Sequence, residues 1–174
     1  METSRSDHTA FTAVRTVSSL LSTERIYHLR RAEVEADPMK KPVIQLERTG
    51  CGIASVAALS GMSYTAAKRA AKRMGISASD SRLWSETTHV RRLLKYYQLQ
   101  PSPMTVPFVS WDTLPNQAIL AIKWRREKGK EFWHWVVFVR DSAGAYVLDS
   151  KKTLKRHTRK DFWRMKPRWF IEVH

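Results

Sequence analysis

The stretch Trp133–Arg140 constrains the fold more than any other, because it is apolar on both faces apart from His134 and the closing arginine. A strand with two apolar faces must be covered on both sides, as the central strand of a sheet is. The residues Asp141–Gly144 that follow have turn chemistry, and Ala145–Asp149 then returns as an antiparallel partner. Ala118–Trp124 is a further strand candidate. The second half of the chain is therefore predicted to form an antiparallel sheet.

The first half of the chain carries helix signals. Ile53–Leu59 is small and apolar all round, which predicts a buried helix, and Gly61 follows where a left-handed C-terminal residue belongs. Ser63 is placed to cap a second helix that runs to about Met74, and Ser85 to cap a third. Helices that precede antiparallel strands predict the α+β class.

A domain boundary is predicted near residue 38. The first 38 residues are balanced in charge, rich in Ser and Thr, and end in Glu-Val-Glu-Ala-Asp-Pro, which is a linker or helix-ending signal. We expect residues 1–38 to be a leader outside the domain, either flexible or preceding the true start of the protein at Met39. Residues 39–174 have the length of one ordinary domain.

The net charge of +15 comes mainly from two segments, one around residues 68–95 and one at 151–174. Such an excess suits nucleic acid, anionic lipid or an acidic protein partner. We favour solvated surface instead, because basic pairs at 68–69 and 72–73 repeat at helical spacing and no nucleic-acid motif accompanies them. An acidic partner or nucleic acid stays open as an alternative.

The composition excludes several classes of protein. A single cysteine excludes an intrachain disulfide framework and a Cys-rich zinc site, and the sequence predicts no cofactor or metal. No window reaches the roughly 18–20 apolar residues that span a bilayer, and the N-terminal segment has no uninterrupted apolar signal region. The expected compartment is a reducing cytoplasm.

Cys51 is the first candidate for chemistry. It lies between Gly50 and Gly52, directly before the predicted buried helix. Free backbone N–H groups and the positive end of the helix dipole favour a thiolate there, and flanking glycines would let a substrate backbone approach the sulfur. The alternative is a small buried hydrophobic residue, as most single cysteines are. Only a base close to Cys51 would favour a catalytic cysteine over a buried hydrophobic one.

His134 is the histidine best placed to be that base. It opens an otherwise apolar strand, whereas His89 is expected at a helix surface or in a satisfied packing contact, and His157 is expected to be solvated among cations. With Asp141–Gly144 as a four-residue loop, Val136 pairs with Asp149, so His134 and Asp149 share a sheet face as diagonal neighbours. The carboxylate would then orient the imidazole and leave one ring nitrogen for the sulfur.

An oxyanion site completes the set. Acyl transfer needs hydrogen-bond donors for the oxygen of the tetrahedral intermediate. The backbone N–H of Cys51 is one candidate, and the side-chain amide of Gln45, six residues upstream, is the other. The alternative for Gln45 is an ordinary surface amide.

The sequence resembles the bacteriocin-processing (double-glycine leader) cysteine peptidases, which are papain-like, and their free-standing relatives. The similarity covers about residues 42–172 and lies in Gln45…Gly50-Cys51-Gly52, the His134 strand and Val147-Leu148-Asp149. It implies a papain-like fold with Cys51 as nucleophile, His134 as base and acid, Asp149 as orienting group and Gln45 as oxyanion donor. Relatives often have Pro after the Asp, whereas this chain has Ser150.

The function expected from the residues and the resemblance is peptide-bond hydrolysis through an acyl-enzyme, with bacterial leader-peptide processing as its specific form. The partners expected are a peptide or protein substrate and, for export, a separate transporter. Two alternatives stay open. One is a transglutaminase or acyltransferase that uses the same triad, and the other is a basic binding module whose triad is vestigial.

Overall fold

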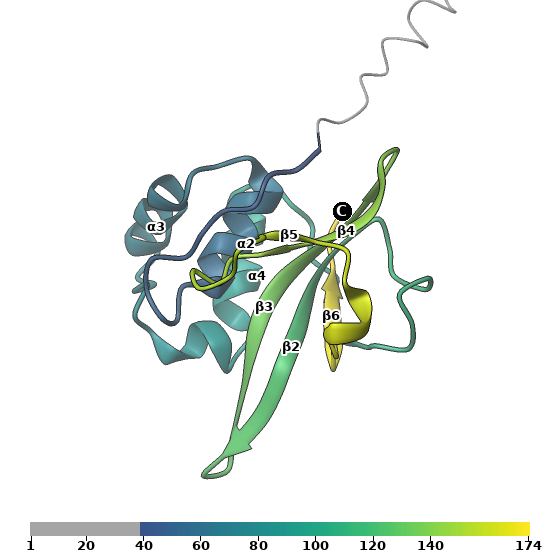
Figure 1. The fold of residues 1–174 in the computed structure, drawn as a ribbon. Helices are drawn as coiled ribbons and strands as arrows, with labels where there is room; N and C mark the ends of the chain where they lie inside the picture. Colours follow the sequence, from purple (N-terminus) through teal and green to yellow (C-terminus); the bar gives the residue numbers. More distant parts are fainter. Residues whose placement is uncertain (1–38) are drawn as a thin grey trace, which may run out of the picture. The chain divides into compact units, whose positions relative to one another are not determined.

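The computed structural model describes residues 39–174, which form helices beside a six-stranded antiparallel sheet (Figure 1). The expectation of a leader at residues 1–38 lies outside the described residues. The helical elements are α2 (Cys51–Ser60), α3 (Tyr64–Arg73), the 3-10 helix η1 (Ser81–Trp84) and α4 (Thr88–Tyr96). The later elements are β1 (Val106–Pro107), β2 (Gln117–Glu127), β3 (Lys130–Asp141), β4 (Gly144–Asp149), β5 (Thr158–Arg159), the 3-10 helix η2 (Phe162–Arg164) and β6 (Trp169–Glu172). The predicted α+β class is confirmed.

Helix α2 forms the centre of the helical half. Every residue from Cys51 to Leu59 is buried, because α2 packs against α3, α4 and β3 at once. Gly61 ends the helix with φ +69° in the left-handed region, as predicted. None of the helices within residues 39–174 is long and apolar enough to cross a membrane.

The two other helices start differently from one another. Ser63 caps α3 as predicted, with its side chain accepting a hydrogen bond from Ala66 N at 3.2 Å. The prediction that Ser85 caps the third helix is wrong, because α4 begins at Thr88. The Asp80 side chain caps Arg82 N instead and starts η1, so that Ser85 ends this 3-10 turn rather than opening a helix.

The sheet has the order β1-β6-β2-β3-β4-β5, which makes β3 a central strand as predicted. The predicted register is also confirmed, with Val136 opposite Asp149 and Arg140 opposite Ala145. The loop is shorter than expected, because Asp141 pairs with Gly144 and extends the ladder by one residue pair. The register is unaffected, since both ends of the loop shorten equally.

The two faces of β3 serve different layers. Trp135 and Val137 lie in the core shared with the helices, and Trp135 Nε1 donates to Leu83 O in η1 at 2.7 Å. Val136 and Phe138 lie in a second apolar cluster on the opposite face. Alternation along the strand places His134 on this second face as well.

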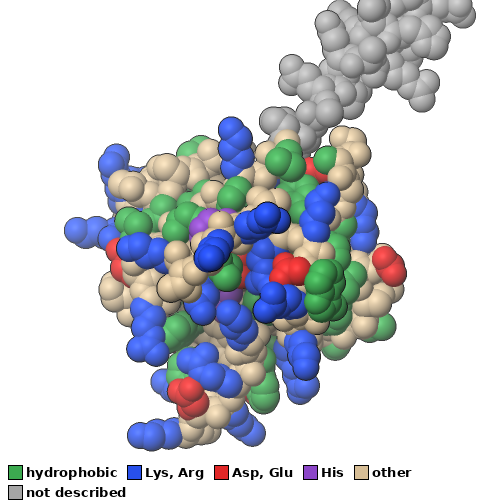
Figure 2. Space-filling view, viewed as in Figure 1, with side chains coloured by type: hydrophobic (Ala, Val, Ile, Leu, Met, Phe, Trp, Pro, Cys, Tyr) green, Lys and Arg blue, Asp and Glu red, His purple; other side chains and the backbone are tan. Residues whose placement is uncertain are grey.

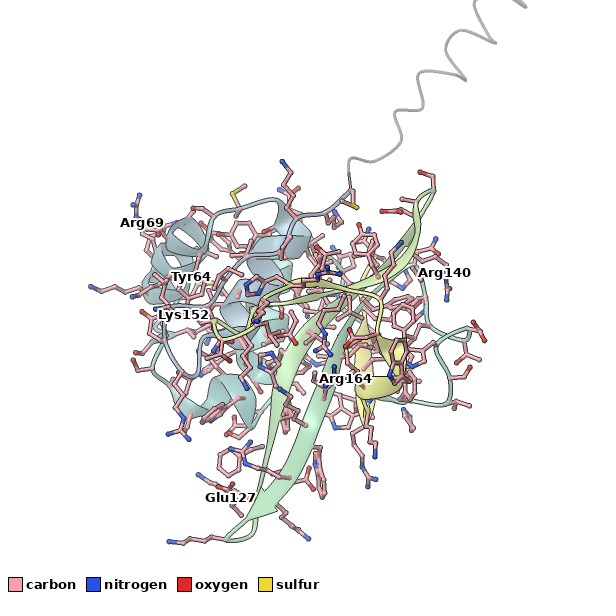
Figure 3. All side chains as sticks on the ribbon, viewed as in Figure 1. Tyr64, Arg69, Glu127, Arg140, Lys152 and Arg164 are labelled. Atoms are coloured by element: carbon pink, nitrogen blue, oxygen red, sulfur yellow. The ribbon has the colours of Figure 1, made fainter. Side chains whose placement is uncertain are left out.

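The β2–β3 hairpin extends well beyond the rest of the sheet (Figure 1), and Glu127 marks its tip in Figure 3. Strand β4 pairs with β3 only between Val136 and Asp141. His134 therefore lies two residues before Val136, just past the point where the pairing with β4 ends.

The glycines beside Cys51 serve packing, contrary to the expectation that they leave room for a substrate. A Cβ atom on Gly50 would lie 2.0 Å from the hydroxyl of Tyr64, which is labelled in Figure 3. A Cβ atom on Gly52 would lie 2.7 Å from Val90 Cγ2 and 3.1 Å from Leu83 O. The protein's own side chains and backbone fill the space that each glycine leaves.

We predict that Gly52→Ala destabilises the protein by about 1–3 kcal/mol, the usual cost of overpacking, because α4 and η1 would have to move away from α2. The measurement is the free energy of unfolding in urea. Lys72→Ala, on the exposed face of α3, is the control and should stay within about 0.5 kcal/mol of the native protein. Equal stability of Gly52→Ala and the native protein would contradict the tight α2–α4 contact.

Candidate active site

Cys51 is the first residue of α2 and is fully buried. Its Sγ lies 3.9 Å from Thr49 O. Because the first N–H groups of a helix have no acceptor within the helix, the backbone N–H of Cys51 is available to an incoming group. The side chain thus stands at the positive end of a helix that is fixed on every side.

His134 and Asp149 form a hydrogen-bonded pair on neighbouring strands. His134 Nε2 lies 2.8 Å from Asp149 Oδ1, and the Asp149 side chain has no exposed surface. The His134 side chain keeps 14% of its surface exposed. With Nε2 on the carboxylate, Nδ1 is the ring nitrogen left for another partner.

Asp149 has further partners that sequence reasoning missed. Lys151 N donates to Oδ1 at 3.0 Å, and Arg159 Nη1 donates to Oδ2 at 2.9 Å. Arg159 also binds Asp161 through Nη2 at 2.8 Å. Arg159 lies in the two-residue strand β5, opposite Val147, and so shares a face with Asp149. A strand of two residues gives no periodic signal, and in the sequence Arg159 is one cation among many.

The electrostatics of the pair favour charges of opposite sign. Burial alone would lower the pKa of His134, but hydrogen bonds with Asp149 and with the Cys51 side chain raise it to about 9. Burial alone would raise the pKa of Asp149, but His134, the Lys151 N–H and Arg159 lower it to about 2. At neutral pH the imidazole is therefore protonated and the carboxylate ionised.

Gln45 lies close to this group and is buried. Its Nε2 donates to Glu47 O and to Arg48 O, both at 3.0 Å, while its Oε1 accepts from Ser150 Oγ at 3.0 Å. Gln45 N also donates to Ser150 O at 3.1 Å. The side chain is thus no surface amide: it ties the segment before Cys51 to the residue that follows Asp149.

Two other histidines also have defined partners. His89 is buried, and its Nε2 lies 3.3 Å from Asp80 Oδ2, whereas its Nδ1 has no hydrogen-bond partner among residues 39–174. The expected satisfied packing contact is therefore confirmed for only one of the two ring nitrogens. The expectation that His157 is solvated is wrong, because it is half-buried and its Nδ1 lies 2.9 Å from Asp149 O. A carbonyl only accepts, so this nitrogen carries the hydrogen. In residues 39–174 no group of three His, Cys, Asp or Glu side chains could hold a metal ion.

Comparisons with known proteins find a likeness of fold. No family model matches the sequence, and the search of curated proteins gives no match. Among solved structures, the chain is similar to a double glycine motif protease from an AMS/PCAT transporter, crystallised in complex with the leader peptide. The identity is 17%, the TM-score is 0.51, and the match covers 80% of this chain and 94% of that one. The likeness to that protease is one of fold.

We predict that the His134 imidazole titrates near pH 9, well above its ordinary value of about 6.5, because the charged form is stabilised by Asp149 and by Cys51. The measurement is an NMR titration of the histidine ring signals. In Cys51→Ala the midpoint should fall, since one of the two hydrogen-bonding partners is lost. A midpoint near 6.5 in the native protein would contradict the arrangement.

Proposed function

We propose that the protein is a cysteine peptidase in which Cys51 is the nucleophile, His134 the general acid and base, and Asp149 the residue that orients the imidazole. The observation that carries this proposal is the 2.8 Å hydrogen bond between His134 Nε2 and the buried Asp149 Oδ1. This contact and a hydrogen bond with Cys51, at the N-terminus of α2, raise the pKa of the imidazole. The similarity of fold to a double glycine motif protease supports it.

In the first half of the reaction, the Cys51 thiolate attacks the carbonyl carbon of the scissile peptide bond, and a carbon–sulfur bond forms. The Cys51 N–H stabilises the oxyanion of the tetrahedral intermediate. The carbon–nitrogen bond then breaks as His134 gives its proton to the leaving amine. A thioester to Cys51 and a neutral imidazole remain.

In the second half, His134 takes a proton from water, which attacks the thioester. The carbon–sulfur bond breaks, the acid product leaves, and the thiolate–imidazolium pair is restored. Asp149 keeps the same ring nitrogen protonated throughout. An amine in place of water would give acyl transfer, which is the expected chemistry of the alternative enzyme class.

As the specific substrate we propose a peptide that carries a leader, cleaved at the end of that leader. Support comes from the fold neighbour, which was crystallised with a leader peptide. We place the peptide in extended form along the part of β3 that precedes Val136, because β4 pairs with β3 only from Val136 to Asp141.

We propose Gln45 as the second oxyanion donor. Both of its amide hydrogens are engaged with backbone carbonyls, so this role requires one of the two contacts to be exchanged for the oxyanion. Gln45→Ala should then lower kcat by about 10²–10³-fold in protein that remains folded. A fall in melting temperature with unchanged kcat would show that Gln45 only ties the segment before Cys51 in place.

The test of the proposed function is cleavage of a peptide library, followed by mass spectrometry of the peptides and of the intact protein. We predict cleavage products and a transient acyl adduct on Cys51, with neither in Cys51→Ala. Repeating the reaction with an added primary amine separates hydrolysis from acyl transfer. No product and no adduct from any peptide would contradict the proposal.

We predict that Asp149→Asn lowers kcat by about 10³–10⁴-fold, because an amide cannot keep the imidazole in its orientation and charge state. The matched control is Asp161→Asn, which alters a carboxylate that also binds Arg159 but does not contact His134. Its turnover should stay within about tenfold of the native value. Native turnover in Asp149→Asn, with an unchanged melting curve, would assign the orienting role elsewhere.

A further inference from the structure

A hollow of about 1300 Å³ lies beside the candidate active site, between the middle of β2 and the segment 154–168 that contains β5 and η2. This volume exceeds the roughly 300–1,000 Å³ of sites for drug-sized ligands. Its lining contains eight Lys or Arg residues and one acid, Asp161, which Arg159 already binds. We call it the basic hollow.

Three lysines of the basic hollow have no acidic partner within residues 39–174. Lys155, Lys160 and Lys166 are exposed and form no ion pair with any residue in the described part of the chain. Figure 2 shows Lys and Arg side chains spread over the face that carries β5 and η2, with few acids among them. Arg164, labelled in Figure 3, lies on η2 and lines the same hollow.

Lys123, which lines the hollow, has another cation close by. Its pKa is lowered, first by loss of solvent and then by the charge of Lys151 nearby. An anion in the hollow would relieve this repulsion, since an opposite charge favours the charged form of an amine.

The basic hollow adjoins the candidate active site through two of its lining residues. Arg159 lines the hollow and binds Asp149, and Ile122, another lining residue, pairs with His134 across the β2–β3 ladder. The hollow therefore lies next to the imidazole and the carboxylate that would act on a bound peptide. Trp163, whose side chain is 79% exposed, and Trp124 add apolar surface to the lining.

We propose that the basic hollow binds an acidic segment of the peptide substrate, so that carboxylates on one side of the scissile bond select the substrate. This inference rests on the proposed peptidase function and adds to it the substrate's charge. Nucleic acid would also meet the charge requirement. A peptide fits better, because the hollow opens beside a nucleophile suited to peptide carbonyls.

The test measures binding to the full chain with Cys51→Ala, which cannot turn the peptide over. The probe is a fluorescein-labelled peptide with six consecutive Glu residues, compared by anisotropy with the same peptide carrying Gln. We expect the Glu peptide to bind more tightly and its affinity to fall with salt. The double variant Lys160→Glu with Lys166→Glu, which we call the hollow variant, should bind the Glu peptide about tenfold or more weakly, because two attractive charges become repulsive.

The control is Lys72→Glu with Lys95→Glu, which gives the same net charge but alters exposed residues of α3 and α4. Its affinity should fall by less than about threefold. Equal losses in the two double variants would overturn the proposal, since the attraction would then come from net charge alone. A single-stranded oligonucleotide is tested in the same way. If it binds more tightly than the Glu peptide, and the hollow variant loses this binding, the proposal is overturned in favour of nucleic acid.

Cleavage by the native protein separates this inference from the proposed function. We expect kcat/KM to be higher for peptides with Glu beside the scissile bond than for their Gln counterparts, and the hollow variant should lose that preference. Cleavage of both sets at equal rates would overturn the substrate role of the hollow while the peptidase stands. Binding without cleavage of any peptide would contradict the proposed function and overturn the inference that the bound acid is a substrate.

Discussion

The structure depends on one buried carboxylate. Asp149 has no exposed surface, so its charge is stable only because His134, the Lys151 N–H and Arg159 surround it. These partners come from β3, from the residues after β4, and from β5. The backbone of Asp149 is held as well, by hydrogen bonds with His157 in both directions. One side chain therefore joins the sheet, the segment beyond it and the imidazole of the candidate site.

The position of Cys51 follows from a second constraint, the complete burial of α2. A helix that packs on all sides has no freedom to rotate. Because Gly50 and Gly52 have no side chains, Tyr64 packs directly against the first and Val90 against the second. The thiol is thus presented at a fixed place by the helical half, while the imidazole is presented by the sheet. The Gln45–Ser150 contacts join the two halves beside the site. Catalysis by positioned groups requires this kind of rigidity.

The sheet register and the buried helix could be predicted from sequence, because both follow from local rules. Alternation and turn chemistry place Val136 opposite Asp149, and shortening the loop symmetrically leaves that pairing intact. The start of α4 was mispredicted, because Asp80 caps a 3-10 turn that competes for the same residues. Arg159 and the contacts of Gln45 could not be found, since they depend on segments that meet only in the folded chain.

The basic residues also have features that are evident from the sequence and others that appear only in the folded chain. Their number is evident from composition, but the sequence alone favours solvated surface for all of them. Folding divides them: Arg159 stabilises a buried acid, while Lys155 and Lys160 line a hollow without neutralising partners. Basic residues of one C-terminal segment thus have separate roles in the folded chain, one beside Asp149 and the others at the hollow.

The most direct test of the account is the rate at which iodoacetamide alkylates Cys51 as a function of pH, in the native protein and in His134→Ala. If the sulfur and the imidazolium form an ion pair, alkylation of the native protein is already fast at neutral pH, and the variant is slower there. A rate that rises with pH as for a free thiol, and equally in both proteins, would contradict the account.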